Sequence, residues 1–176
     1  MIPASASGLA PAAVSAGSWA IVPSASTAQF TVRDKLVTTV HGSFPVRSGT
    51  ATIRAGGDVA GAHVELDVAG VATGNARRDK DLRTARFLDA VGHPTLVVQT
   101  GPSAAGGSGW QLAATLSARG ASVPLTLEVT PTAQQGERVT VRVTGRLDRT
   151  GLGIKAPTFI VGRDIDIEVQ AVFEPA

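Results

Sequence analysis

The strongest constraint on this chain is the regular alternation of apolar and polar residues along many short stretches. In the closing stretch DIDIEVQAVF, Ile165 and Ile167 fall on one face while Asp166 falls on the other. A period of two is typical of a β-strand that buries one face. About eight such stretches follow one another, separated by turn signals such as Gly56-Gly57. The sequence therefore predicts antiparallel strands that each bury a single side.

Strands of this kind need a shared interior, and a closed barrel provides one while removing the sheet edges. The predicted fold is all-β, an eight-stranded antiparallel barrel, with a two-sheet sandwich as the alternative. Residues 18–176 are expected to form one domain, since 176 residues suit a single core. Residues 1–17 are predicted to be a disordered tail, because Ser, Gly and Pro interrupt their apolar residues.

The N-terminal segment also bears on localisation. No Lys or Arg precedes Arg33, and a secretory signal needs a basic start and a continuous apolar run. We therefore expect a cytoplasmic protein, or a secreted one if the native leader is missing from this chain. No apolar run is long enough to predict an integral membrane segment.

One insert, around residues 75–92, breaks the alternation. Asn75 can cap a helix start, and Pro94 returns the chain to a strand. Two pairs of opposite charge have the i,i+4 spacing of a helix face: Arg77 with Asp81, and Asp79 with Arg83. The insert also offers a short apolar stripe: Leu82, Ala85 and Leu88, with Phe87 beside it. We expect one or two short helices over a sheet end, either as a solvated connector or as a lid.

The residues that carry chemistry are few. The chain has no cysteine, and its three histidines, His41, His63 and His93, lack the spacing of a zinc site. No nucleophile elbow or phosphate-binding glycine loop is present. We therefore predict no catalytic residues, no metal and no cofactor. A net charge of +2, two Trp and no Tyr argue against nucleic-acid binding.

Two charged residues fall on the apolar face of their strands. Continued alternation from Phe30 and Val32 turns Asp34 inward, and continued alternation from Leu147 turns Arg149 inward. An inward charge needs a partner. Three outcomes are open: the two residues form an ion pair at the barrel end, a turn directs their side chains outward, or they contact the head group of a ligand.

Several stretches in the same order resemble the YceI-like family, lipocalin-like polyisoprenoid-binding barrels. The resemblance runs from Trp19 to Glu174, and its motifs are WAIVPSASTAQFTVRD, VHGSF, TGNARRDKDLRTARFLDAVGHP, LSARGASVPLTL, LDRTGLGI and VGRDIDIEV. The chain departs from the family pattern at polar and aromatic positions that lie around one barrel end: Val22, Ala25, Asp34, Asp81 and Leu88.

The resemblance implies a lipocalin-like barrel that carries a long isoprenoid-type lipid, such as a polyprenyl pyrophosphate or a quinone-like molecule. It implies no catalysis, and a homodimer is compatible with it. An eight-stranded barrel is wide enough to hold one small ligand or to be filled by side chains. The predicted lumen wall is Phe30, Val32, Phe44, Ile53, Val64, Leu66, Phe87, Leu88, Leu96, Val98, Leu112, Leu116, Leu125, Leu127, Val141, Leu147 and Ile167.

The polar end of such a ligand would meet charged residues. The head-group candidates are Asp34, Arg83 and Arg149. If the insert is a lid, five basic residues would lie near the opening: Arg77, Arg78, Lys80, Arg83 and Arg86. The alternatives to a lipid carrier are a stress-related interaction module with a side-chain-filled barrel, and an enzyme acting on a lipid-like substrate.

Overall fold

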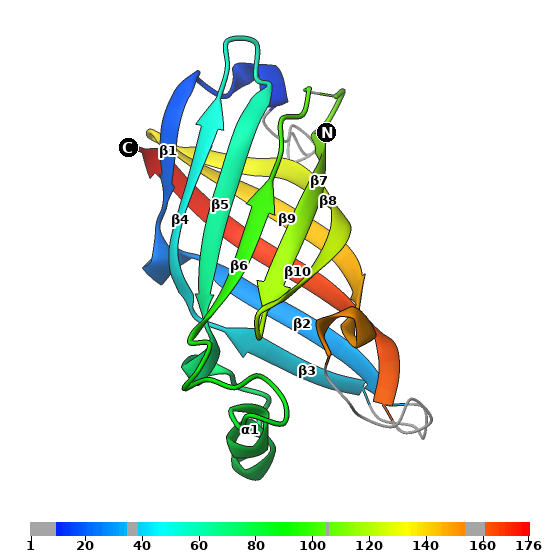
Figure 1. Ribbon diagram of the computed structural model, residues 1–176. Coiled ribbons are helices and arrows are strands. Elements are labelled where there is room, and N and C mark those ends of the chain that lie inside the picture. The colour runs from blue at the N-terminus through cyan, green and yellow to red at the C-terminus, as the bar shows by residue number, and fades with distance from the viewer. Residues whose placement is uncertain (1–9, 35–38, 105, 154–160) are drawn as a thin grey trace, which may run out of the picture.

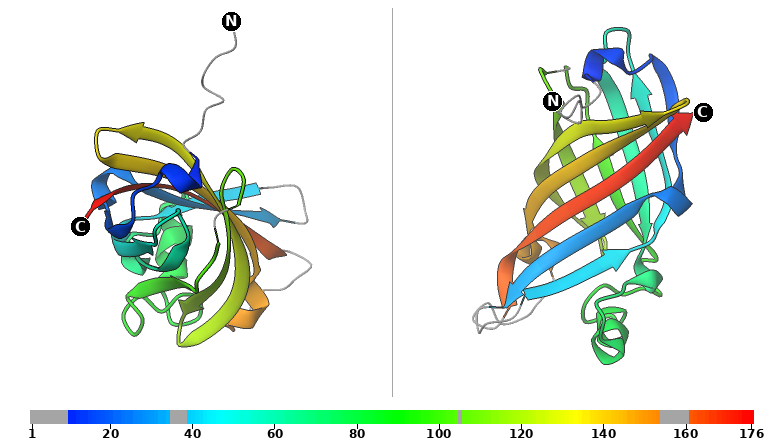
Figure 2. Two further views of the ribbon diagram at one scale, coloured as in Figure 1. Left: turned by 90° about the horizontal axis from the view of Figure 1, so that it is seen from above. Right: turned by 180° about the vertical axis from the view of Figure 1, so that it is seen from behind.

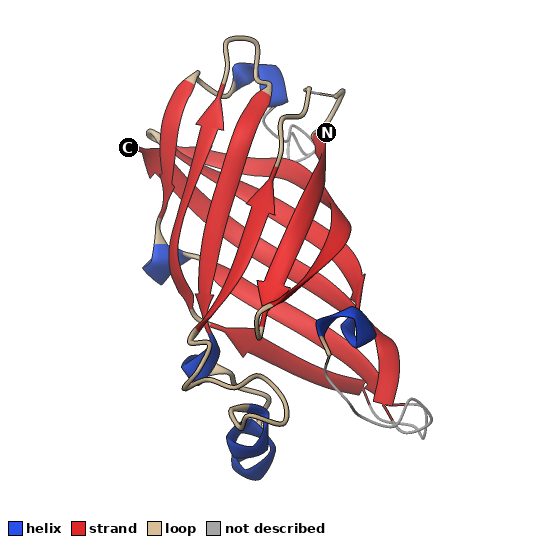
Figure 3. Cartoon of the chain, viewed as in Figure 1, coloured by secondary structure: helices blue, strands red, loops and turns tan. Residues whose placement is uncertain are grey.

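The computed structural model describes residues 10–34, 39–104, 106–153 and 161–176. Within these ranges β-strands dominate, and short helical turns lie at the ends and along one side of the sheet (Figure 3). The strands are β1 (Gly17–Ile21), β2 (Thr27–Asp34), β3 (Thr39–Phe44), β4 (Val46–Ile53), β5 (Val59–Asp67), β6 (Thr95–Thr100), β7 (Trp110–Ala118), β8 (Ala121–Gln135), β9 (Arg138–Asp148) and β10 (Val161–Pro175).

The sheet closes on itself, as Figure 1 shows. Neighbouring strands follow the order β1-β4-β5-β6-β7-β8-β9-β10, and β10 pairs back onto β1 through Phe173 and Pro175. All of these pairs are antiparallel. The β2–β3 hairpin continues the wall, because β2 pairs with β10 between Val161 and Gln170. The predicted eight-stranded antiparallel barrel is confirmed.

The ten strands correspond to eight long ones, two of which are interrupted. β1 and β2 both pair with β10, and the 3-10 turn η3 (Pro23–Ala25) separates them. β3 pairs with β2 and β4 pairs with β1, and Pro45 lies between β3 and β4. Proline lacks the N–H that a strand interior uses, so the pairing breaks at that point. The sequence prediction missed β1 and β3, which are the shorter halves of these broken strands.

Alternation separates the two faces of the wall as predicted. In β7, Trp110, Leu112, Ala114 and Leu116 are buried, and the residues between them are exposed. The outer face of β9 and β10 instead carries three cross-strand ion pairs: Arg138–Glu174, Arg142–Glu168 and Arg146–Asp166. These pairs are exposed to solvent, so they contribute little to stability.

The β4–β5 end of the barrel is closed by aromatic residues. Trp110 is buried and its indole Nε1 donates to the Gly57 carbonyl at 2.7 Å. Trp19 is buried as well and donates to the Ser15 carbonyl at 3.0 Å. The 3-10 turn η2 (Pro11–Ala13) precedes it, and Val14 after this turn is buried at the same end.

The structure thus differs from the predicted disordered tail over residues 10–17. Buried Pro11 and Val14 belong to the fold, and β1 already begins at Gly17. Residues 1–9 lie outside the described residues. Figure 2 shows the N-terminal 3-10 turn beside the upper end of the barrel.

The predicted insert lies at the opposite end. It begins after η4 (Val68–Gly70) and contains one helix, α1 (Ala76–Leu82). The Asn75 carboxamide caps α1 by accepting from the Arg78 N–H at 3.0 Å, as the sequence predicted. No helix in the described ranges is long and apolar enough to cross a membrane.

The two predicted i,i+4 ion pairs of the insert are wrong. Asp79 accepts hydrogen bonds from the N–H and hydroxyl of Thr73, at 2.9 and 2.5 Å, instead of pairing with Arg83. Arg83 donates to the Ala69 carbonyl at 2.8 Å. Arg83 is the C-cap of α1 and its N–H still bonds the Asp79 carbonyl, so the pair is absent because both side chains bond other groups. Likewise, no ion pair joins Arg77 to Asp81 in the described part of the chain.

Candidate functional site

The barrel encloses a cavity of about 640 Å³. This volume lies within the range of roughly 300–1,000 Å³ that is typical of small-molecule sites. Its wall is almost entirely apolar and receives side chains from all ten strands. A cavity with such a wall can hold a hydrocarbon, because burial of apolar surface is the dominant favourable term in binding.

Several inward-facing side chains keep exposed surface although they point into the barrel. Val64, Val98, Val143, Ile167 and Val169 line the cavity, and each is only half-buried. In a filled interior such residues would touch neighbours on every side. The space next to them therefore belongs to the lumen, which is not filled by the protein's own side chains.

Polar groups gather at the insert end of this lumen. Thr73, Asn75, Arg77, Arg78 and Asp81 all line the cavity from the start of the insert. The Arg78 guanidinium is fixed there, because its Nε donates to the Thr73 hydroxyl at 2.8 Å and its Nη2 to the Thr73 carbonyl at 2.9 Å. The lumen thus has two different ends: one where Trp19 and Trp110 lie, here called the aromatic end, and one at the insert, here called the polar end, which Phe87 also lines.

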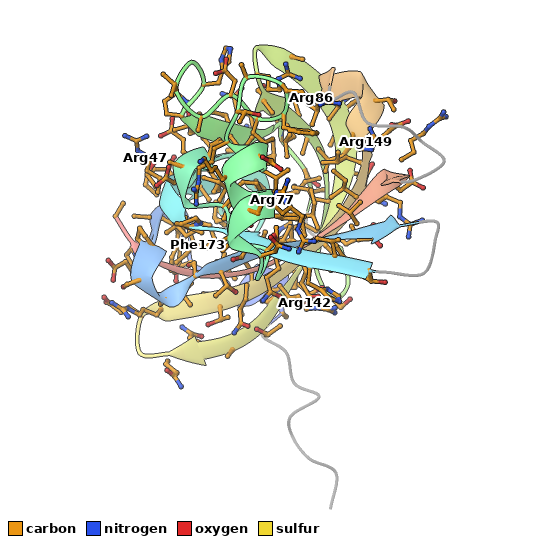
Figure 4. All side chains as sticks on the ribbon, turned by 90° about the horizontal axis from the view of Figure 1, so that it is seen from below. Arg47, Arg77, Arg86, Arg142, Arg149 and Phe173 are labelled. Atoms are coloured by element: carbon orange, nitrogen blue, oxygen red, sulfur yellow. The ribbon has the colours of Figure 1, made fainter. Side chains whose placement is uncertain are left out.

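Arg149 joins this polar end from the other side of the barrel. It is the first residue of the 3-10 turn η5 (Arg149–Leu152), lines the cavity and is only 3% exposed. Asp148 caps the turn by accepting from the Thr150 hydroxyl at 2.6 Å and from the Thr150 N–H at 2.9 Å. These hydrogen bonds from Thr150 hold the pKa of Asp148 below its ordinary value. Figure 4 views the barrel from below, the end that carries α1, and labels Arg149 and Arg77.

The comparisons with known proteins agree with this architecture. The sequence matches the family model of the YceI-like domain over residues 19–173. The chain belongs to the YceI-like family. No curated protein sequence matches it.

Solved structures show the same YceI-like fold. Alignment with BcnA from Burkholderia cenocepacia gives a TM-score of 0.74 at 18% identity, covering 86% of this chain and 98% of that chain. A polyisoprenoid binding domain from Saccharophagus degradans, implicated in plant cell wall breakdown, gives a TM-score of 0.68 at 13% identity. This alignment covers 90% of this chain and 98% of that chain. The YceI protein of Campylobacter jejuni gives a TM-score of 0.69 at 18% identity, covering 80% of this chain and 87% of that chain.

All seventeen apolar residues predicted for the wall lie on the lumen of this YceI-like barrel. Contact between these residues and a ligand stays a prediction. The strand residues among them follow directly from alternation. Phe87 and Leu88 reach the lumen from the insert, together with Leu82, whereas Ala85 of the expected apolar stripe is exposed.

The head-group candidates lie in different places. Arg149 is on the wall, but Arg83 is exposed, lies away from the wall and bonds the Ala69 carbonyl. Asp34 ends β2, and its side chain lies outside the described part of the structure. Lys80 and Arg86 also lie off the wall, and the Arg86 guanidinium sits 5.5 Å from the centre of the Phe87 ring.

One polar atom in the lumen was missed by the sequence prediction. Thr100, at the end of β6, lines the cavity, and its buried hydroxyl has no hydrogen-bond partner. Alternation places position 100 on the same face as Leu96 and Val98, so the pattern alone could have identified it.

The histidines lie outside the lumen. His63 bonds Gln99 and lies 3.5 Å from Glu65, and exposed His41 bonds Thr31. Among the described residues, no three His, Cys, Asp or Glu side chains are grouped to hold a metal ion.

Proposed function

We propose that this YceI-like barrel binds one long isoprenoid-type lipid in its lumen and carries or stores it without chemical change. The observation that carries the proposal is the cavity of about 640 Å³ with an apolar wall. The fold relative described as a polyisoprenoid binding domain supports the ligand class. The cavity also argues against the alternative of a side-chain-filled interaction module.

The energetics favour a long apolar ligand. Each CH₂ group removed from water contributes about 0.8 kcal/mol to binding. The nine residues of β5 span about 30 Å, so a chain of comparable length can lie along the lumen. The cost of immobilising a flexible chain limits the affinity. No single strong polar contact is needed to hold such a molecule.

The polar end of the lumen suits the head group. Arg149 and Arg78 line the cavity, and a guanidinium group binds phosphate oxygens through paired hydrogen bonds. A polyprenyl pyrophosphate would use these contacts more fully than a neutral quinone-like lipid. This arrangement directs the hydrocarbon tail toward the aromatic end.

Native mass spectrometry of the purified protein tests the ligand, followed by organic extraction and identification of what is released. The proposal predicts a stoichiometric polyprenyl or quinone-like mass. A clean apoprotein that also ignores added polyprenyl lipids would overturn it.

A matched pair of variants tests the head group. Arg149→Met removes a guanidinium on the lumen wall, whereas Arg83→Met removes one outside it. A charge-assisted hydrogen bond contributes about 1.5 kcal/mol or more, so Arg149→Met should weaken binding of a polyprenyl pyrophosphate roughly tenfold or more. Binding of the corresponding uncharged prenol should change much less, and Arg83→Met should leave both unchanged. Equal losses for the two lipids would rule out this role of Arg149, and Arg78→Gln provides the same comparison if Arg149→Met does not fold.

A further inference from the structure

The net positive charge of the chain resides in the insert that carries α1. The chain has 16 Lys and Arg residues and 14 Asp and Glu residues. The segment from Thr73 to Pro94 holds five of the basic and three of the acidic residues, so the rest of the chain has eleven of each. The barrel without the insert is therefore neutral overall, and the excess charge lies at one end.

The basic side chains of the insert differ from those of the outer wall in their partners. The outer-wall residues Arg138, Arg142 and Arg146 each pair with an acidic side chain. Among the described residues, none of the five cations of the insert forms an ion pair. Arg78 and Arg83 bond Thr73 and a backbone carbonyl, which leaves their charge in place.

The insert also carries an exposed apolar residue. Val91 is 95% exposed, and no other large hydrophobic residue in the described ranges is exposed. Close by in the chain, the Arg86 guanidinium lies 5.5 Å from the centre of the half-buried Phe87 ring. The insert thus combines basic side chains that form no ion pair with one exposed apolar side chain, and both kinds of residue contribute to binding at the interface of anionic membranes.

We propose that Lys80, Arg86 and Val91 form a docking surface for an anionic lipid bilayer, here called the insert surface. Basic side chains would meet the phosphates, and Val91 would enter the head-group region. The insert contributes residues to the wall at the polar end of the lumen, and α1 lies in front of the barrel when it is seen from below (Figure 4), so docking would bring this end to the membrane. The proposal rests on the proposed lipid-binding function for its purpose, which is transfer of the ligand between bilayer and lumen.

Vesicle co-sedimentation of the full chain tests the surface. The probes are phosphatidylcholine vesicles with and without 30% phosphatidylglycerol, a composition chosen as about that of a strongly anionic membrane. Each basic residue near such a surface contributes about 1 kcal/mol, which is about fivefold in affinity. Lys80→Gln with Arg86→Gln should therefore weaken binding to anionic vesicles about thirtyfold. Val91→Ser should weaken it several-fold.

The matched control is Arg54→Gln with Arg138→Gln, which changes the net charge equally at the opposite end of the barrel. It should leave vesicle binding within about twofold of the parent protein. Equal losses in the control and the insert variant would overturn the proposal, as would binding that does not depend on phosphatidylglycerol. The proposal would also be overturned if the parent protein is a dimer that does not bind vesicles and if Val91→Asp dissociates this dimer. A second copy of the chain would then cover the insert surface.

Lipid binding in the lumen is measured separately, with a short polyprenol added without vesicles. Lys80 and Arg86 lie off the lumen wall, so their variants should bind the polyprenol like the parent protein. If neither the parent protein nor any variant binds polyprenol, the proposed function is refuted. If the variants lose vesicle binding but still bind polyprenol, the loss concerns the insert surface alone.

Discussion

Val143→Phe distinguishes an open lumen from a packed one. Val143 lies midway along β9, pairs with Val129 and Val169 on its two neighbours, and lines the cavity with both of them. In a close-packed core, an enlarged side chain costs about 1–3 kcal/mol of stability. Beside an open lumen, the ring has space. The free energy of unfolding of the lipid-free variant should therefore fall by less than about 1 kcal/mol.

The same ring should displace ligand. Replacing Val by Phe adds about four carbon atoms to the lumen, and at about 0.8 kcal/mol for each displaced CH₂ the loss is about 3 kcal/mol of binding. This corresponds to an increase of about 200-fold in the Kd of a polyprenyl lipid. Urea unfolding of the lipid-free protein measures the stability, and titration followed by native mass spectrometry measures the Kd.

The control for Val143→Phe is Thr144→Phe, which adds a ring one residue later. Thr144 is absent from the cavity wall, and its cross-strand partners are Glu128 and Glu168 on the outer face. It should leave the Kd unchanged. If Val143→Phe destabilises the lipid-free protein by 2 kcal/mol or more while Thr144→Phe does not, the lumen is packed and the reasoning is wrong. An unchanged Kd for Val143→Phe would show that the ligand does not occupy the middle of the barrel.

Three further predictions concern single polar groups. Thr100→Val removes a buried hydroxyl without a partner, so the free energy of unfolding in urea should rise by about 1 kcal/mol, and a decrease would show that the hydroxyl is satisfied. Arg119→Asn removes the guanidinium that bonds the carbonyls of Ala85 and Gly153, while Asn tolerates the positive φ at this turn. Loss of these two bonds should increase the rate of amide hydrogen exchange several-fold in the insert but not in β8. Thr150→Val removes the hydroxyl that lowers the pKa of Asp148, so the NMR titration midpoint of this carboxyl should move up toward its ordinary value. Because the folded pKa is the lower one, the stability that Asp148 contributes is complete above its ordinary pKa and is lost as the pH falls through the lowered value, an acid loss that Thr150→Val should reduce.

Alternation was sufficient to predict most of the barrel, because a period of two fixes which side chains share a face. It failed where a strand is short and broken. β3 contains Gly42, which contributes no side chain to the alternation pattern. The ring of Phe30 on β2 lies over this glycine. A Cβ at this position would overlap that ring, so the small residue reflects a contact across strands that local sequence does not reveal.

The wall of the site was predictable for the same reason, but its polar end was not. The insert has a single helix of seven residues followed by turns, so no period relates Leu82, Ala85 and Leu88. Arg83 was predicted to reach a ligand, yet its direction depends on the Ala69 carbonyl, which belongs to the preceding 3-10 turn. Arg149 was predicted to turn inward and is buried, although it lies in a 3-10 turn and not in the strand.

The two ends of the lumen together give a bound lipid a direction. At the aromatic end, the indole N–H groups of Trp19 and Trp110 already bond backbone carbonyls, so they offer no donor to a ligand. A charged head group placed there would lose its hydration without replacement, at a cost of several kcal/mol. At the insert end, Arg78 and Arg149 line the cavity, and their guanidinium groups would replace that hydration in the proposed complex. In the proposed complex the tail would therefore enter first, and the head group would stay beside the insert, where exchange with a membrane would occur.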